Sequence, residues 1–212
     1  MRSIVKEACV ERLDEAILAE KNGANRIELC SRLDLDGLTP HRNMIKDVIN
    51  SVKIPVKVMI RPRAGNFIYH GHELDVMKDD ILYCKRVKAS GIVLGVLKKD
   101  KTVDLIATRL LSDIASGLEV TFHKAIDKVG SIFTELDRLR SIQAVTNILT
   151  SGGADSAMKG SDTLKGMFNR YKGQLTIIAS GKITEQNIIQ VHELIGAQEY
   201  HGRKIVGDLR PI

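Results

Sequence analysis

The chain has 212 residues, a formal net charge of +6, no tryptophan and only 4% aromatic residues. So few aromatic side chains argue against a stacking surface for single-stranded nucleic acid, and the lysines and arginines are spread along the chain without a dense basic run. No window approaches the roughly eighteen consecutive apolar residues of a membrane-spanning helix. We therefore expect no nucleic-acid partner and no membrane partner.

Short runs rich in β-branched residues alternate with longer stretches of helical spacing. In chain order, the predicted strands are residues 4–9, 26–30, 56–60, 92–94, 119–122, 145–149, 175–179 and 199–201. Helical spacing of apolar residues is clearest over 44–52, 74–84, 103–114 and 188–195. Glycines at helix-ending positions precede several strands: Gly23, Gly91, Gly117, Gly173 and Gly196.

Strict alternation of strands and helices predicts parallel strands joined by right-handed crossovers. Eight such units form a (β/α)8 TIM-type barrel, and we expect residues 1–212 to be a single domain of this kind. The alternative, an open doubly wound sheet, usually carries a glycine fingerprint after its first strand. The first strand here ends in Cys9-Val10-Glu11-Arg12 without a glycine, which favours the barrel.

The end of the sequence is too short for a complete eighth helix. Only eleven residues follow His201, and Pro211 is among them. We expect the outer wall beside the eighth and first strands to be thinly covered and to leave apolar surface exposed. Such a surface is commonly covered by a second copy of the chain, so we predict a homodimer.

The three cysteines, Cys9, Cys30 and Cys84, are odd in number and form no CxxC motif. A disulfide framework is therefore not expected, and a reducing cytoplasm is the natural location. The first residues lack the apolar core of a secretory signal, which agrees with that location.

Two arginines stand at the carboxyl end of the third predicted strand. Pro62 cannot donate a hydrogen bond to a sheet ladder, so the strand must end between Arg61 and Arg63. Ligands of α/β proteins bind at this end of the sheet, and a guanidinium matches a carboxylate or a phosphate with two parallel hydrogen bonds. We expect both arginines to bind a small anion, with an ion pair to barrel carboxylates as the structural alternative.

Other polar side chains are expected at the same mouth, because the carboxyl ends of all eight strands meet there. Side-chain alternation turns Glu7 together with Cys9, Glu28 together with Cys30, and Arg61 together with Arg63. We interpret Glu7, Glu28 and His123 as candidate catalytic acids or bases, since imidazole ordinarily titrates near neutrality. A structural histidine bonded to a neighbouring carboxylate is the alternative for His123.

Small residues end the sixth and seventh strands, where the backbone can approach a ligand closely. Ser151, Gly152 and Gly181 are candidate anion-binding residues for this reason, and Lys182 adds a positive charge. His201 closes the eighth strand, where barrels frequently bind phosphate. Ordinary turn chemistry is the alternative for the glycines, and a surface position is the alternative for the lysine.

Blocks spread over almost the whole chain resemble the CutC family, the copper homeostasis proteins. They are Glu28-Leu29-Cys30-Ser31, Gly37-Leu38-Thr39-Pro40, Met59-Ile60-Arg61-Pro62-Arg63, Met77-Lys78-Asp79-Asp80-Ile81, Val93-Leu94-Gly95-Val96-Leu97, Thr121-Phe122-His123-Lys124-Ala125 and Leu149-Thr150-Ser151-Gly152-Gly153. The resemblance implies a (β/α)8-type fold, a cytoplasmic dimer and a role in copper tolerance or copper(I) binding. This chain departs from the family pattern after the seventh strand, where Ser180 and Lys182 stand in a loop that is usually richer in glycine.

Copper(I) prefers soft thiolate ligands. Cys9 and Cys30 lie on neighbouring predicted strands, about 4.8 Å apart, and share one ion if their registers match. The alternative is that both are small buried hydrophobic residues, as Cys84 on its helix is expected to be. Three functions stay open: copper homeostasis through copper(I) binding, an enzyme acting on a small phosphorylated or carboxylated metabolite, and a non-catalytic dimeric scaffold.

Overall fold

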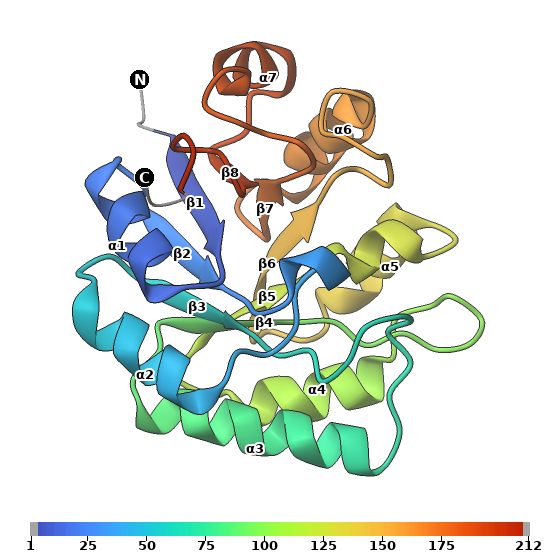
Figure 1. The fold of residues 1–212 in the computed structure, drawn as a ribbon. Coiled ribbons are helices and arrows are strands. Elements are labelled where there is room, and N and C mark those ends of the chain that lie inside the picture. Colours follow the sequence, from blue (N-terminus) through green and yellow to red (C-terminus); the bar gives the residue numbers. More distant parts are fainter. Residues whose placement is uncertain (1–3, 210–212) are drawn as a thin grey trace.

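The computed structural model describes residues 4–209 and shows a closed barrel of eight parallel strands (Figure 1). The strands are β1 (Val5–Val10), β2 (Arg26–Leu29), β3 (Val56–Met59), β4 (Gly91–Leu94), β5 (Glu119–Phe122), β6 (Val145–Thr150), β7 (Thr176–Ala179) and β8 (Glu199–Gly202). Each strand pairs with the next, and β8 pairs with β1. The predicted (β/α)8 barrel is confirmed.

Helices cover the outside of the barrel (Figure 1). They are α1 (Leu13–Lys21), α2 (Arg42–Ser51), α3 (His72–Arg86), α4 (Leu105–Ile114), α5 (Ile132–Leu139), α6 (Ser161–Tyr171) and α7 (Ile188–Ile195), with short 3-10 turns η1 (Leu33–Leu35) and η2 (Lys124–Lys128). Within residues 4–209 no helix is long and apolar enough to cross a membrane.

The main hydrophobic core lies between the strands and these helices. Outward-facing strand residues such as Ile27, Leu29, Val58 and Phe122 are fully buried there. A second, small cluster lies inside the barrel and contains Cys9, Cys30, Met59 and Val93. The interior therefore has an apolar patch that includes two cysteines.

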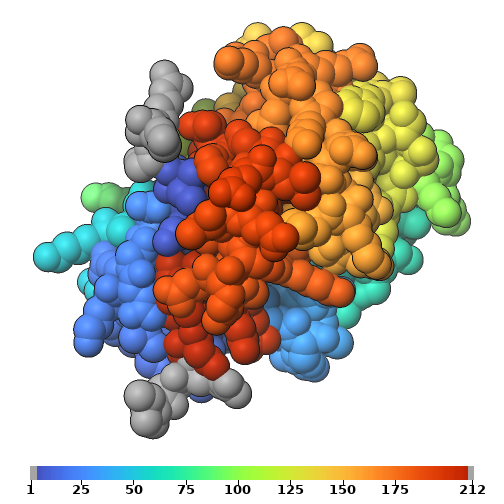
Figure 2. All heavy atoms as spheres, turned by 90° about the horizontal axis from the view of Figure 1, so that it is seen from above, coloured from blue at the N-terminus to red at the C-terminus, as the bar shows by residue number. Residues whose placement is uncertain are grey.

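Within the described residues no helix follows β8, and the segment 203–209 packs against the outside of the barrel instead. Ile205, Val206 and Leu209 are buried, and Asn22 Nδ2 donates a 3.1 Å hydrogen bond to the carbonyl of Val206. Figure 2 shows this red segment lying directly against the blue N-terminal elements. Tyr200, at the centre of β8, is fully buried.

The apolar surface expected beside β8 and β1 is therefore absent from the described part of the chain, because the segment 203–209 covers it with its own side chains. The exposed large apolar residues lie on helices α1, α3, α4 and α7 instead: Ile17, Leu82, Ile106, Leu110 and Ile189. The homodimer stays a prediction.

Two local expectations also need correction. On α4 the buried face consists of Ala107, Thr108, Leu111 and Ser112, whereas Ile106 is 79% exposed. The apolar spacing over residues 103–114 had suggested a stripe that includes Ile106 and Leu110, but Leu111 and three small residues face the barrel. Gly91 does not end a helix: it is the first residue of β4, and a Cβ there would lie 2.7 Å from the carbonyl oxygen of Glu119.

Candidate functional site

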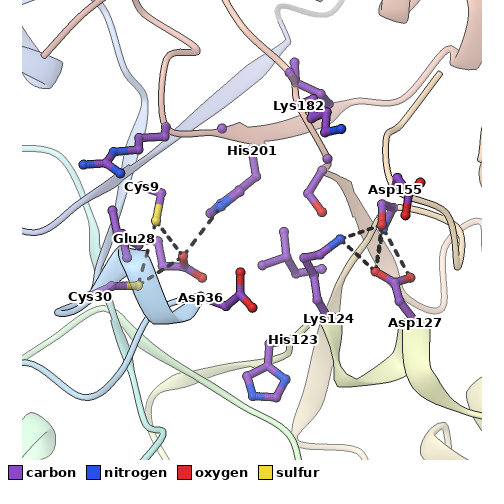
Figure 3. A pocket seen from close by; sticks show the side chains of 18 of the residues that line it. Cys9, Glu28, Cys30, Asp36, His123, Lys124, Asp127, Asp155, Lys182 and His201 are labelled. Carbon is purple, nitrogen blue, oxygen red and sulfur yellow. Dashed lines mark hydrogen bonds and ion pairs between the residues drawn. The ribbon is translucent and has the colours of Figure 1, made fainter. Parts of the chain in front are cut away.

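A cavity of about 610 Å³ opens where the carboxyl ends of the strands meet (Figure 3). A second cavity, of about 880 Å³, lies toward the amino ends of β4 and β5, beside Ser90 and Glu119. Ligand sites of (β/α)8 barrels lie at the carboxyl ends, so the first cavity is the candidate site.

Cys9 and Cys30 face each other in the wall of this cavity (Figure 3). Their Sγ atoms are 3.9 Å apart, and both contact Oε2 of Glu28, at 3.2 Å from Cys9 and 3.4 Å from Cys30. The register explains this group: Cys9 is paired with Glu28, and alternation turns Cys30 to the same side as Glu28. The sequence correctly placed these three side chains together.

The two thiols do not behave alike. The hydrogen bond with Cys30, aided by His201 and opposed by burial, lowers the pKa of Cys9 to about 5. The same sulfur–sulfur contact, together with burial, raises the pKa of Cys30 well above its usual value. Burial also raises the pKa of Glu28 well above its ordinary range. The pair therefore forms one thiolate readily and a second one only with a compensating positive charge.

A network of charges lies beside the cysteines. Nδ1 of His201 is 2.8 Å from Oε1 of Glu7, and its Nε2 is 3.6 Å from Oε2 of Glu28. Arg26 forms ion pairs with both Glu7 and Glu199. Burial alone would raise the pKa of Glu7, but the hydrogen bond from His201 and the charge of Arg26 bring it down to about 2.

Glu7 is consequently a permanent carboxylate that orients His201. Burial alone would lower the pKa of His201, but Glu28, Cys9 and Glu7 together raise it well above its ordinary value. Of the two carboxylates predicted as catalytic, Glu28 lines the cavity, whereas Glu7 lies behind His201 and is not among the lining residues.

Arg61 lines the cavity but is committed to the backbone. Its Nη1 donates to the carbonyls of Leu35 and Gly37, each at 2.9 Å, and its Nη2 donates to that of Gly65 at 3.2 Å. The guanidinium also lies over the ring of Phe67, 4.9 Å from the centroid. Arg61 therefore holds the loops after β2 and β3 with both Nη atoms and cannot bind an anion through the two of them; only its Nε has no hydrogen-bond partner among the described residues.

Arg63 does not reach the cavity. It forms an ion pair with Glu73 on α3, and its Nη2 donates to the carbonyl of Ile68 at 2.7 Å. The expectation that Arg61 and Arg63 share one direction was wrong, because alternation holds only within a strand and β3 ends at Met59.

The amide groups after β6 are already occupied by a carboxylate of the chain itself. Asp127 accepts hydrogen bonds from the amides of Ser151 and Gly153, at 3.0 and 2.9 Å, and from the hydroxyl of Thr150 at 2.5 Å. The ammonium group of Lys124 lies 3.0 Å from the same carboxylate. The predicted anion site is thus filled internally: Asp127 occupies the amide of Ser151, and the amide of Gly152 donates to the hydroxyl of Thr150. Figure 3 shows Lys124 beside Asp127.

The two predicted glycines differ in position. Gly152 does not line the cavity, and a Cβ there would lie 2.6 Å from the carbonyl oxygen of Gly160. Gly181 does line the cavity; it has a left-handed φ of 102°, and a Cβ there would lie 2.8 Å from the side chain of Ser151. Close packing of the neighbouring loops therefore requires glycine at both positions.

His123 is held as a neutral ring. Its Nδ1 accepts a 3.2 Å hydrogen bond from the amide of Ala125, and burial together with the charge of Arg61 lowers the pKa of His123 to about 3. The ring must then carry its proton on Nε2, which has no hydrogen-bond partner among the described residues. This histidine is suited to donating a hydrogen bond, but it is a weak base at neutral pH.

Comparisons with known proteins agree with this geometry. The model of the CutC family matches residues 4–206. A human protein, the copper homeostasis protein cutC homolog, is 40% identical over 195 residues, which cover 92% of this chain and 71% of the relative. A CutC family protein from Enterococcus faecalis is 36% identical over 210 residues, which cover 96% of this chain and 100% of the relative.

This chain belongs to the CutC family. The crystal structure of a CutC protein from Streptococcus agalactiae superposes with a TM-score of 0.90 at 30% identity, covering 95% of this chain and 99% of that one. The resemblance inferred from the sequence blocks is therefore confirmed.

One departure from the CutC family pattern now has a structural meaning. Lys182 lies in the loop after β7, where the family pattern is richer in glycine. Its backbone has a left-handed φ of 58°. Such a backbone conformation suits glycine and costs a lysine about 1 kcal/mol or more. Lys182 is exposed at the rim of the cavity.

Sequence reasoning missed the other basic residues of the rim. Lys128 ends the turn η2, and Arg203 and Lys204 follow β8; all three line the cavity. Their positions depend on how far each loop folds back over the mouth, and the sequence carried no signal for that. Asp36 and Asp155 are acidic rim residues that were missed for the same reason.

Proposed function

We propose that this CutC family protein takes part in copper homeostasis by binding copper(I) through Cys9 and Cys30 at the mouth of its barrel. The observation that carries this proposal is the 3.9 Å separation of the two Sγ atoms in the wall of the cavity. The names of the relatives in human and mouse, copper homeostasis protein cutC homologs, support it.

The donor set suits a soft monovalent ion. Thiolates are the ligands that select copper(I), and a metal–thiolate bond is about 2.3 Å long, so one ion can reach two sulfurs separated by up to about 4.6 Å. Cys9 and Cys30 satisfy this limit. The third cysteine, Cys84, lies on α3 in the main core outside the barrel and takes no part.

The neighbours of the cysteines can complete the site. The ligand atoms of Cys9, Glu28 and Cys30 all lie within 4.8 Å of one another, and the same holds for Glu7, Glu28 and His201. A carboxylate behind a ligating histidine fixes its orientation in many metal sites, and Glu7 stands in that relation to His201. Bound copper(I) would supply the positive charge that lets both thiols ionise.

We also propose a cytoplasmic location. All three cysteines are free, and a thiol pair that binds copper(I) must stay reduced, which the cytoplasm provides.

The test is an anaerobic titration of the full chain with copper(I), in competition with the chromophoric chelator bicinchoninate. We expect one copper(I) per chain, at least a hundredfold weaker binding in Cys30→Ser and in Cys9→Ser, and unchanged binding in the control Cys84→Ala. Equal affinities in the wild type and Cys30→Ser would refute the proposal.

A further inference from the structure

We propose that the same cavity has a second ligand, a small organic anion, held by the rim lysines Lys128 and Lys182 and by the hydroxyl of Ser180. This site is independent of copper. Figure 3 shows Lys182 on the side of the cavity opposite Cys9 and Cys30.

The cavity is much larger than a single metal ion. It measures about 610 Å³, whereas one water molecule accounts for about 30 Å³ of liquid. Cavities of 300–1,000 Å³ are typical of sites for small organic molecules. A copper(I) ion at the cysteine pair would leave most of this volume free.

Polar atoms without partners gather around this cavity. Among the described residues, seven buried side-chain nitrogen or oxygen atoms lack a hydrogen-bond partner within the protein, and four of them belong to residues that line it. They are Glu28 Oε1, Arg61 Nε, His123 Nε2 and Ser180 Oγ. Buried polar atoms in native proteins are nearly always satisfied, so this concentration points to a polar ligand.

Three of these four atoms, all except Glu28 Oε1, favour an electron-rich ligand. Arg61 Nε and the neutral ring of His123 can only donate hydrogen bonds, and the hydroxyl of Ser180 can also donate. Oxygen atoms of carboxylate, phosphate, carbonyl or hydroxyl groups accept such bonds. A ligand rich in donors would leave these atoms unsatisfied.

The rim supplies the charge. Six basic side chains line the cavity against four acidic ones, and one of those acids, Asp127, is paired with Lys124. Lys128 and Lys182 are exposed, and within residues 4–209 neither ammonium group has an ion-pair or hydrogen-bond partner. Two cations at the mouth of a polar cavity attract a compact anion.

The backbone at Lys182 is strained. Its φ of 58° is unfavourable for a residue with a side chain, and a glycine there would relieve the strain. Lys88 and Lys101 share a positive φ without lining the cavity, so the support from Lys182 is the position of its ammonium group at the mouth.

The test measures the thermal midpoint, Tm, of the metal-free, reduced full chain with sodium phosphate, pyruvate or citrate, each compared with sodium chloride at equal ionic strength. We expect at least one of these anions to raise Tm by about 3–6 °C at ten times its Kd. Lys128→Gln/Lys182→Gln should weaken that binding at least tenfold, and Ser180→Ala should weaken it about threefold to tenfold.

The matched control is Lys46→Gln/Lys172→Gln, which removes two exposed lysines that do not line the cavity. It should keep the affinity of the wild type within twofold. The proposal is wrong if none of the three anions raises Tm more than sodium chloride does, if the rim double variant binds as well as the wild type, or if the control pair weakens binding equally.

Discussion

Replacing Asp127 tests the internal carboxylate at the end of β6. Its side chain is only 6% exposed, and it accepts hydrogen bonds from two amides and two hydroxyls, those of Ser151, Gly153 and Thr150. A hydrogen bond to a charged group contributes about 1.5–3 kcal/mol, and an unpaired buried amide costs about 1–3 kcal/mol. Because these contributions are not additive, we expect Asp127→Ala to lower the free energy of unfolding by about 4 kcal/mol.

Urea denaturation at pH 7 measures this loss, and the control Asp155→Ala should change stability by less than about 0.5 kcal/mol. Asp155 lines the same cavity, but its side chain is 79% exposed. The vacated amides of Asp127→Ala should then accept an external anion, so sodium formate should recover part of the lost stability, and more than sodium chloride at equal ionic strength. A loss below about 1 kcal/mol, or no recovery with formate, would refute the assignment.

Three further predictions concern residues of the mouth. The pKa of His123 is about 3 in the folded state and 6.5 in the unfolded state. Between these values the unfolded chain binds more protons, so the free energy of unfolding falls as the pH is lowered. From pH 7 to pH 5, urea denaturation should show that the wild type loses about 2 kcal/mol more than His123→Asn. The charges facing this ring are those of Arg61 and Asp127. Arg61→Lys should cost about 2–3 kcal/mol, because a single ammonium nitrogen does not reproduce the two separated Nη atoms that reach the three carbonyls; a loss under about 1 kcal/mol would contradict that role. Lys182→Gly should raise the free energy of unfolding by about 1 kcal/mol, whereas Lys172→Gly, whose φ is −52°, should not raise it.

Much of the barrel could be predicted because its signals are local. Each strand is a short apolar run, and alternation within a strand fixes which residues share the interior. This is why Cys9, Glu28 and Cys30 could be placed together before their contacts were known. The pairing of Cys9 with Glu28 then follows from the parallel register of β1 and β2.

The errors lie where a side chain depends on distant parts of the chain. Arg63 lies beyond the end of β3 and forms an ion pair with Glu73 on α3. Asp127 reaches the amide of Ser151, 24 residues further along the chain, so an open anion site could not be distinguished from a filled one. On α4, the spacing of large apolar residues included Ile106, but the residues that pack against the barrel are Leu111 and the small residues Ala107, Thr108 and Ser112.

The mouth combines two kinds of chemistry. The sulfur atoms of Cys9 and Cys30 lie in one part of the cavity wall (Figure 3). Hydrogen-bond donors and the rim lysines line another part. Arginines do not favour copper(I), and the structure resolves this difficulty by committing Arg61 to backbone carbonyls and Arg63 to Glu73. In our proposals, the sulfur pair binds the metal ion and the anion binds beside it in the same cavity.

Copper K-edge X-ray absorption on the reduced full chain, loaded with one equivalent of copper(I), tests the central claim most directly. We predict sulfur neighbours at about 2.3 Å, the length of a metal–thiolate bond, and loss of one of them in Cys9→Ser and in Cys30→Ser but not in Cys84→Ala. Copper that is not retained, or that shows only nitrogen and oxygen neighbours in the wild type, would contradict the assignment of Cys9 and Cys30 as its ligands.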